Sequence, residues 1–150
     1  MSKYSQDNFI PKNPHKLVGN ATPFYRSSWE LTVMTLLDNH PNVIQWASES
    51  ITIPYINPLT GKRSLYVPDF FVLYRDKSGR ERAELIEVKP RKEAIAENAK
   101  SKRDRAALVV NTAKWAAAMT YCKKAGINFR ILTENDIYIT KGNKLKKKQS

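Results

Sequence analysis

The chain has 150 residues and carries 26 lysines and arginines against 14 aspartates and glutamates, a formal net charge of +12 at pH 7. The length suits one domain with short tails, and an apolar fraction of 41% is enough for one packed core. No apolar run reaches the ~20 residues that span a bilayer, and the N-terminus does not resemble a secretory signal. The single Cys122 excludes a disulfide framework and a cysteine-rich zinc site. We therefore expect a small, soluble, cytoplasmic protein whose charge favours polyanionic partners.

Three segments are expected along the chain. Residues 1–23 hold three of the eight prolines and few periodic apolar residues, which predicts an irregular basic arm. Residues 141–150 are rich in lysine and poor in apolar side chains, which predicts a flexible basic tail. Residues 24–140 lie between them and are predicted to form the folded domain.

The predicted elements of this domain alternate between helix and strand. A helix is expected where apolar residues recur at the spacing of one helix face, and a strand where aromatic and β-branched residues run together. Pro68 falls within one such run and indicates a strand edge or bulge. In chain order the predicted elements are a helix over 27–39, a strand toward the end of 44–56, strands over 64–74 and 82–89, a helix over 104–125 and a strand over 128–132.

This order favours an α/β fold with a central mixed sheet flanked by helices. The turn at 76–79 is expected to join the strands 64–74 and 82–89 into a hairpin that leads to a crossover helix. The long helix is predicted to present one apolar face, made by Ala106, Val109, Val110, Ala113 and Ala117.

Two carboxylates and a lysine stand out on the predicted hairpin. Glu87 and Lys89 are two apart in a strand and project from one face. Pairing of the two strands would bring Asp69 close to Glu87. Such carboxylates hold a hard cation such as Mg²⁺, which activates water for phosphodiester hydrolysis, while a lysine orients or deprotonates that water. The alternative is a surface salt bridge between Glu87 and Lys89 with Asp69 as an ordinary strand-edge acid, and spacing alone leaves both open.

Glu30 also has two interpretations. Ser27-Ser28-Trp29-Glu30 has the S-x-x-E pattern of a capping box, in which the glutamate binds backbone donors at a helix start. Glu30 also borders the apolar stripe of the predicted helix, so its carboxylate can point beneath the sheet. It is therefore a candidate third metal ligand.

These four residues lie in a series of sequence blocks that resembles a known superfamily. The blocks are RSSWE, WASESITIPY, YVPDFFV, ELIEVKPRKE and NTAKWAAAMTYCKKAGINFRILTE. In this order they resemble the PD-(D/E)xK nucleases, and among them the head completion nucleases of T4-like tailed phages, from about residue 11 to 134. The blocks are similar, more distantly, to the endonuclease subunit of Tn7-type transposition.

The resemblance implies a restriction-endonuclease-like core and a DNA nuclease that depends on Mg²⁺ or Mn²⁺. It implies catalytic roles for Glu30, Asp69, Glu87 and Lys89, with the three acids as metal ligands. It further implies action on packaged double-stranded DNA during head completion before head–tail joining. Cutting is expected to lack sequence specificity, because little of the chain is left for a base-reading module. The protein would then work in the host cytoplasm, with phage head or portal proteins as partners and an association with the virion.

A basic stretch that begins at Lys89 is the expected DNA-binding surface, because each neutralised phosphate releases counterions. A solvated mobile loop is the alternative. The residues of this stretch expected to bind DNA are Arg91, Lys92, Lys100, Lys102, Arg103 and Arg105. Lys114, on the long helix, is a further candidate that would face the DNA or the site, with an ordinary solvent-exposed helix face as its alternative.

Two other functions remain open at this point. One is a structural head-completion or DNA-end-binding protein with a vestigial nuclease core. The other is a transposase-type endonuclease subunit.

Two further residues close to the candidate site in sequence are expected to be structural. Glu49 is expected to be a strand-edge acid. Tyr66 is expected to pack against its neighbours, and its closeness to Asp69 would also let it line the groove beside that residue.

Overall fold

The computed structural model describes residues 6–19, 22–90 and 100–133. The predicted tail at 141–150, and the predicted DNA-binding residues Arg91 and Lys92, lie outside these ranges. The elements are β1 (Asp7–Asn8), η2 (Pro14–Lys16), β2 (Phe24–Tyr25), α1 (Ser28–Asn39), β3 (Val43–Ser48), β4 (Ile53–Ile56), β5 (Arg63–Tyr66), β6 (Phe70–Arg75), β7 (Glu81–Val88), α3 (Lys102–Ala125) and β8 (Asn128–Leu132).

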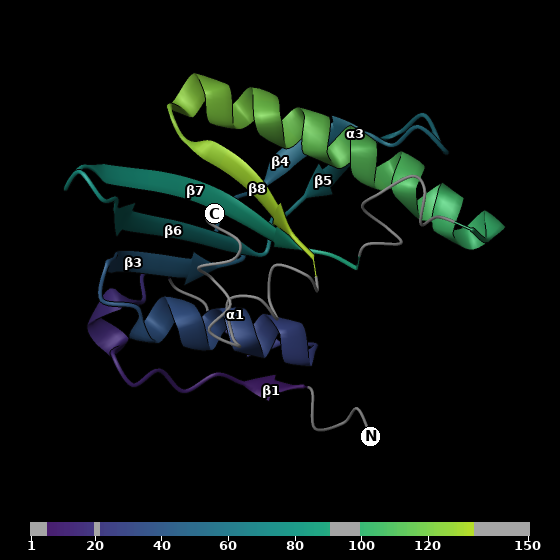
Figure 1. Cartoon of the computed structure of the whole chain (residues 1–150). Coiled ribbons are helices and arrows are strands. Elements are labelled where there is room, and N and C mark those ends of the chain that lie inside the picture. The colour runs from purple at the N-terminus through teal and green to yellow at the C-terminus, as the bar shows by residue number, and fades with distance from the viewer. Residues whose placement is uncertain (1–5, 20–21, 91–99, 134–150) are drawn as a thin grey trace.

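A four-stranded mixed sheet lies between the two long helices, with α1 on one face and α3 on the other (Figure 1). Its order is β3-β6-β7-β8, in which β3, β6 and β7 pair antiparallel and β8 runs parallel to β7. The parallel strand follows α3, since a parallel neighbour needs a crossover connection. This arrangement confirms the predicted α/β fold with a central mixed sheet flanked by helices. In the part of the chain that the structure describes, no helix has the length and apolarity to cross a membrane.

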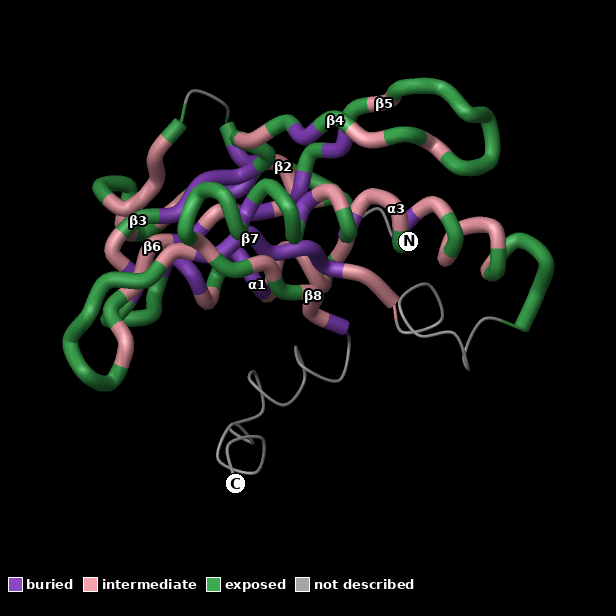
Figure 2. The backbone as a smooth tube through the Cα atoms, turned by 90° about the horizontal axis from the view of Figure 1, so that it is seen from above, coloured by how far each residue is buried: buried purple, intermediate pink, exposed green. Residues whose placement is uncertain are grey.

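The α1 face holds the larger core. Val33, Met34 and Leu37 of α1 pack with Trp46 of β3 and Phe70 of β6. Burial becomes continuous toward the end of β7, where every residue from 84 to 88 is buried (Figure 2). The carboxyl end of β7 is therefore enclosed, and a charged residue placed there needs a partner.

The opposite face is covered by α3 and by the separate two-stranded sheet of β4 and β5. The buried positions of α3 are Asn111, Trp115, Ala118 and Cys122, none of which belongs to the predicted apolar face. Of that predicted face, Ala117 packs against the core on this side of the sheet, whereas Val109 is 46% exposed. Alanines are distributed all round this helix, so the tertiary contacts with β4 and β8 selected the buried face. The helix ends as predicted at Gly126, whose φ of 75° suits glycine.

The predicted strand over 64–74 is in fact two strands in different sheets. β5 ends at Tyr66 and β6 begins at Phe70, and β5 pairs with β4 while β6 pairs with β3 and β7. The buried Pro68 lies in the break, where its missing N–H costs no ladder hydrogen bond. The region 44–56 likewise contains two strands, β3 and β4, where only one was predicted. The break places Asp69 directly before β6.

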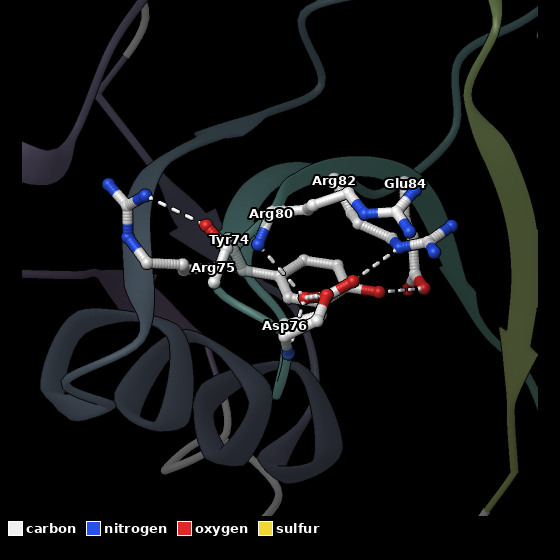
Figure 3. A network of polar contacts seen from close by, with 8 residues as sticks. Tyr74, Arg75, Asp76, Arg80, Arg82 and Glu84 are labelled. Carbon is white, nitrogen blue, oxygen red and sulfur yellow. Dashed lines mark hydrogen bonds and ion pairs between the residues drawn. The ribbon is translucent and has the colours of Figure 1, made fainter.

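The turn between β6 and β7 is held by charged side chains at the end of the sheet opposite the strand break (Figure 3). Asp76 accepts hydrogen bonds from Ser78 and from the Arg82 guanidinium at 2.7 Å, which hold the pKa of its carboxyl well below the usual range. Glu84 accepts a hydrogen bond of 2.9 Å from the Tyr74 hydroxyl. The Asp76 contacts lie in the turn itself, whereas the Tyr74–Glu84 hydrogen bond links β6 to β7 within the strands.

Residues of the predicted N-terminal arm contact the domain. Phe9 is buried and packs edge-to-face on Trp46 with ring centroids 5.7 Å apart. The buried carboxylate of Asp38, in α1, accepts hydrogen bonds from the backbone N–H groups of Lys12 and Asn13 at 2.8 and 3.0 Å. The arm therefore closes one end of the α1 core.

Candidate active site

Asp69 and Glu87 meet where β6 begins and β7 ends. Phe70 pairs with Ile86, so their neighbours Asp69 and Glu87 are adjacent across the two strands. The backbone N–H of Val88 donates to Asp69 Oδ2 at 2.8 Å, and the N–H of Asp69 donates to Glu87 Oε1 at 3.3 Å. Each carboxylate is thus held by the backbone of the other strand, and the structure brings the two predicted acids together.

Three side chains surround the Glu87 carboxylate. The Tyr66 hydroxyl donates to Oε1 at 2.8 Å, and the Lys89 ammonium lies 3.7 Å from Oε2. The Lys114 ammonium, from α3, lies 5.6 Å from the centroid of the Tyr66 ring. Glu87 is only 5% exposed, so its pair with Lys89 is not the surface salt bridge of the alternative interpretation. Lys114 points toward the site and not toward open solvent.

Burial and neighbouring charges shift the pKa values of three groups in the site. Burial and the neighbouring charge of Glu87 raise the pKa of Asp69 to about 8. Burial also raises the pKa of Glu87, against the opposing effect of the Lys89 charge. Burial and the positive charge of Lys89 lower the pKa of Lys114. Such shifts, produced by desolvation together with specific charged neighbours, are typical of functional sites.

Ser27 caps α1 as the capping-box pattern predicts, but the Glu30 carboxylate accepts from the residue before the cap and not from the Ser27 N–H. The Ser27 hydroxyl accepts from the Glu30 N–H at 3.1 Å, and Glu30 Oε1 accepts from the Arg26 N–H at 2.8 Å. The negative charge of Glu30 nevertheless contributes to the raised pKa of Asp69, so the two carboxylates are close. The Glu30 carboxylate therefore holds the backbone just before α1 and also lies near Asp69.

A shallow hollow between α1 and the sheet has Glu30, Glu49 and Asp69 among its lining residues. Glu49 follows β3 with a φ of 51°, a left-handed conformation that is uncommon for glutamate. Its N–H donates to the carbonyl oxygen of Asp69 at 3.0 Å, and its carboxylate pairs with Arg26 at 3.0 Å. From the sequence, Glu49 was expected to be a strand-edge acid and Arg26 had no predicted role. The adjacency of Arg26 to the capping motif was the only sequence signal available for it.

The carboxylate pair fits a hard cation of the Mg²⁺ type. Within the described ranges, no three His, Cys, Asp or Glu side chains form a group ready to hold a metal ion. Mg²⁺ is commonly bound by one or two carboxylates, with water and substrate phosphate as its other ligands. The pair of half-buried Asp69 and buried Glu87 is such a donor set, and a cation between them would relieve their repulsion. Glu30 lines the hollow beside Asp69 but is turned to the Arg26 backbone.

Comparison with known proteins places the chain in a family. Residues 40–134 match the family described as TnsA-like endonuclease N terminal. The chain is also 39% identical over 140 residues to the head completion nuclease of enterobacteria phage T4, across 86% of this chain and 91% of that protein. The chain belongs to the TnsA-like endonuclease family. This confirms the resemblance found in the sequence, and the mixed sheet flanked by helices fits the restriction-endonuclease-like fold.

The TnsA-like match covers most of the candidate site. Asp69, Glu87, Lys89 and Lys114 fall within it, whereas Glu30 precedes its first residue.

The described cations before and in the first turn of α3 are all exposed. Cations at a helix N-terminus oppose the helix dipole, so this placement is not explained by helix stability. These exposed cations are Lys100, Lys102, Arg103 and Arg105.

Proposed function

We propose that this protein is a metal-dependent nuclease that hydrolyses phosphodiester bonds of double-stranded DNA. The observation that carries the proposal is the enclosed pair of Asp69 and Glu87 with Lys89 beside it. Mg²⁺ or Mn²⁺, when bound, supplies Lewis-acid polarisation of the phosphoryl group and a water of lowered pKa. The membership of the chain in an endonuclease family supports the same chemistry.

Each residue of the site has a distinct proposed role. Asp69 and Glu87 hold the cation, and Glu30 adds a carboxylate from α1. Lys89 orients the attacking water and offsets the charge that develops in the transition state. Tyr66 fixes the orientation of the Glu87 carboxylate through the hydrogen bond from its hydroxyl to Oε1.

The proposed DNA path runs over the start of α3. The exposed cations there, with Lys114 and the predicted Arg91 and Lys92, would contact the sugar–phosphate backbone. Backbone contacts position a protein on DNA and carry no direct sequence information, so cutting without sequence preference is expected.

The proposed biological setting is the completion of phage heads. The relative from phage T4 carries the name head completion nuclease, and the similarity extends over most of both chains. We infer that this chain acts on packaged DNA before head–tail joining, in the host cytoplasm, with head or portal proteins as partners.

Plasmid cleavage tests the catalytic assignment. Supercoiled DNA is incubated with Mg²⁺ and wild-type protein, with Asp69→Ala, or with Lys89→Ala. Each variant should lose at least about 10²-fold in nicking rate, and chelation of the metal should abolish wild-type nicking. Glu81→Ala and Lys77→Ala are matched controls, because these residues lie at the opposite end of the β6–β7 pair.

Two results would contradict the proposal. Equal nicking by wild type and both site variants would place the chemistry elsewhere. If even the wild-type protein fails to cut while it still binds DNA, the structural DNA-end-binding alternative is favoured.

A further inference from the structure

The hollow beside the candidate active site contains one described cation among several acids. Glu30, Glu49 and Asp69 line it, and Arg26 is the basic residue among its described lining residues. A phosphodiester that approaches Asp69 from this side meets carboxylates, which repel it. Arg26 is the group placed to offset that repulsion.

The Arg26 guanidinium is held between an aromatic ring and a carboxylate. Its central carbon lies 5.5 Å from the centroid of the Phe24 ring, and its Nη1 lies 3.0 Å from Glu49 Oε2. Stacking on an aromatic face orients the planar guanidinium while leaving its N–H donors available. The arginine side chain is therefore preorganised at the edge of the hollow.

The Glu49 carboxylate can be replaced by a phosphate as the partner of Arg26. The two side chains are 55% and 39% exposed, and pairs this exposed add little to stability. A phosphate offers the same guanidinium two oxygens in the bidentate geometry that arginine favours. Glu49 is meanwhile fixed by its own backbone, since its N–H donates to Asp69. Losing Arg26 as a partner would thus leave Glu49 in place.

We propose that Arg26 binds a backbone phosphate of the DNA substrate, exchanging the Glu49 carboxylate for phosphate oxygens. This rests on the proposed nuclease function. Lys89 and Lys114 approach the carboxylate pair from the end of β7 and from α3, whereas Arg26 lies at the start of α1. The DNA strand is then held by cations from both layers that flank the sheet.

Salt-dependent DNA binding tests the proposal without cleavage. Binding of a short fluorescent DNA duplex is followed by anisotropy in EDTA over a range of salt concentrations. Arg26→Ala should reduce the slope of log K against log[salt] by about 0.9, the value for one phosphate contact. If the contact acts only through counterion release, that change weakens binding about eightfold at 0.1 M salt. Arg26→Lys, which keeps the charge, should keep most of the slope.

Glu49→Gln separates phosphate binding from a structural role. A phosphate-binding Arg26 competes with Glu49 for its partner, so this variant should bind DNA at least as tightly as wild type. Arg75→Ala is the matched control, because Arg75 forms a similarly exposed pair with Glu81 at 3.6 Å, at the end of the β6–β7 pair opposite the site. Its slope should equal that of wild type.

Three outcomes would overturn the assignment of Arg26. The first is an unchanged slope in Arg26→Ala, while wild-type cleavage with Mg²⁺ is intact; the nuclease proposal then survives alone. The second is an equal loss of binding and of thermal stability in Arg26→Ala and Glu49→Gln, which a purely structural ion pair predicts. The third is a wild-type protein that neither binds nor cuts DNA, which would overturn both proposals together.

Discussion

Replacement of Asp69 by asparagine should stabilise the metal-free protein at neutral and alkaline pH. Asparagine keeps the oxygen that accepts from the Val88 N–H at 2.8 Å, and it removes the charge that faces Glu87. Its amide N–H₂ group also offers the Glu87 carboxylate a donor in place of a second negative charge. The variant would lose catalysis and gain stability, a trade expected where a site holds like charges together.

The magnitude follows from the raised pKa of Asp69, from the usual 3.8 to about 8. The folded state binds a proton that the unfolded chain has released at pH values between these two, so wild-type stability falls as pH rises through this window. The loss of wild-type stability caused by ionising Asp69 is absent below pH 3.8 and fully present above about pH 8. The advantage of the variant should therefore grow by up to about 1.4 kcal/mol per pH unit within the window, and then stay constant.

Urea denaturation in EDTA, followed by tryptophan fluorescence from pH 4 to pH 9, measures this difference. Asp76→Asn provides a control of opposite sign. Hydrogen bonds from Arg82 and Ser78 depress the pKa of Asp76, so its charge stabilises the fold above the usual pKa of aspartate. That control variant should be less stable than wild type, and the difference should stay nearly constant from pH 5 to pH 9, because the contribution of Asp76 is lost only below the usual pKa of aspartate.

Two results would refute the prediction for Asp69. One is an Asp69→Asn variant that is less stable than wild type at pH 9 in EDTA. The other is a difference between the two proteins that does not grow between pH 5 and pH 8. Either result would mean that the carboxylate pair is not under electrostatic strain.

Four further outcomes are expected. A divalent cation at 100 times its Kd should raise the free energy of unfolding of the wild type by about 2.7 kcal/mol, and that of Asp69→Ala by much less, as measured by thermal denaturation. Tyr66→Phe removes the hydroxyl that fixes Glu87 and should slow plasmid nicking about tenfold, roughly the value of a hydrogen bond to a charged group; an unchanged rate would make Tyr66 a packing residue only. Lys114→Met removes a charge that lowers the pKa of Glu87, so the acid limb of the pH–rate profile should move to higher pH, and a shift to lower pH would contradict the assignment. Phe9→Ala should cost about 3–5 kcal/mol in urea denaturation, whereas a cost below about 1 kcal/mol would show that the arm adds little to the core.

Local pattern was sufficient to predict the long elements of the fold. The helix 27–39 and the strand 128–132 were predicted nearly as they occur, because capping, apolar periodicity and β-branched runs act within a few residues. The break of the strand 64–74 was not predicted. Whether a chain continues in one sheet or passes to another depends on partner strands, and no local signal near Pro68 encodes them.

The buried face of α3 was the least predictable feature. Alanine-rich helices offer several faces of similar hydrophobicity, so contacts from β4 and β8 decide which one is covered. That choice buries Asn111 and points Lys114 at the Tyr66 ring. A lysine whose role had been open from sequence is thus placed beside the carboxylate pair.

The sequence by itself determined the chemistry available to this protein: two acids and a lysine on one hairpin, a glutamate at a helix start and a large excess of positive charge. Strand periodicity alone puts Glu87 and Lys89 on one face. Only the tertiary structure decided how these groups act on one another. Burial at the end of β7 turns an ordinary pair of acids into a strained one, and the fold brings Arg26 and Glu49 to the same hollow as Asp69. Desolvation and the approach of distant segments are properties of packing, so no local pattern encodes them.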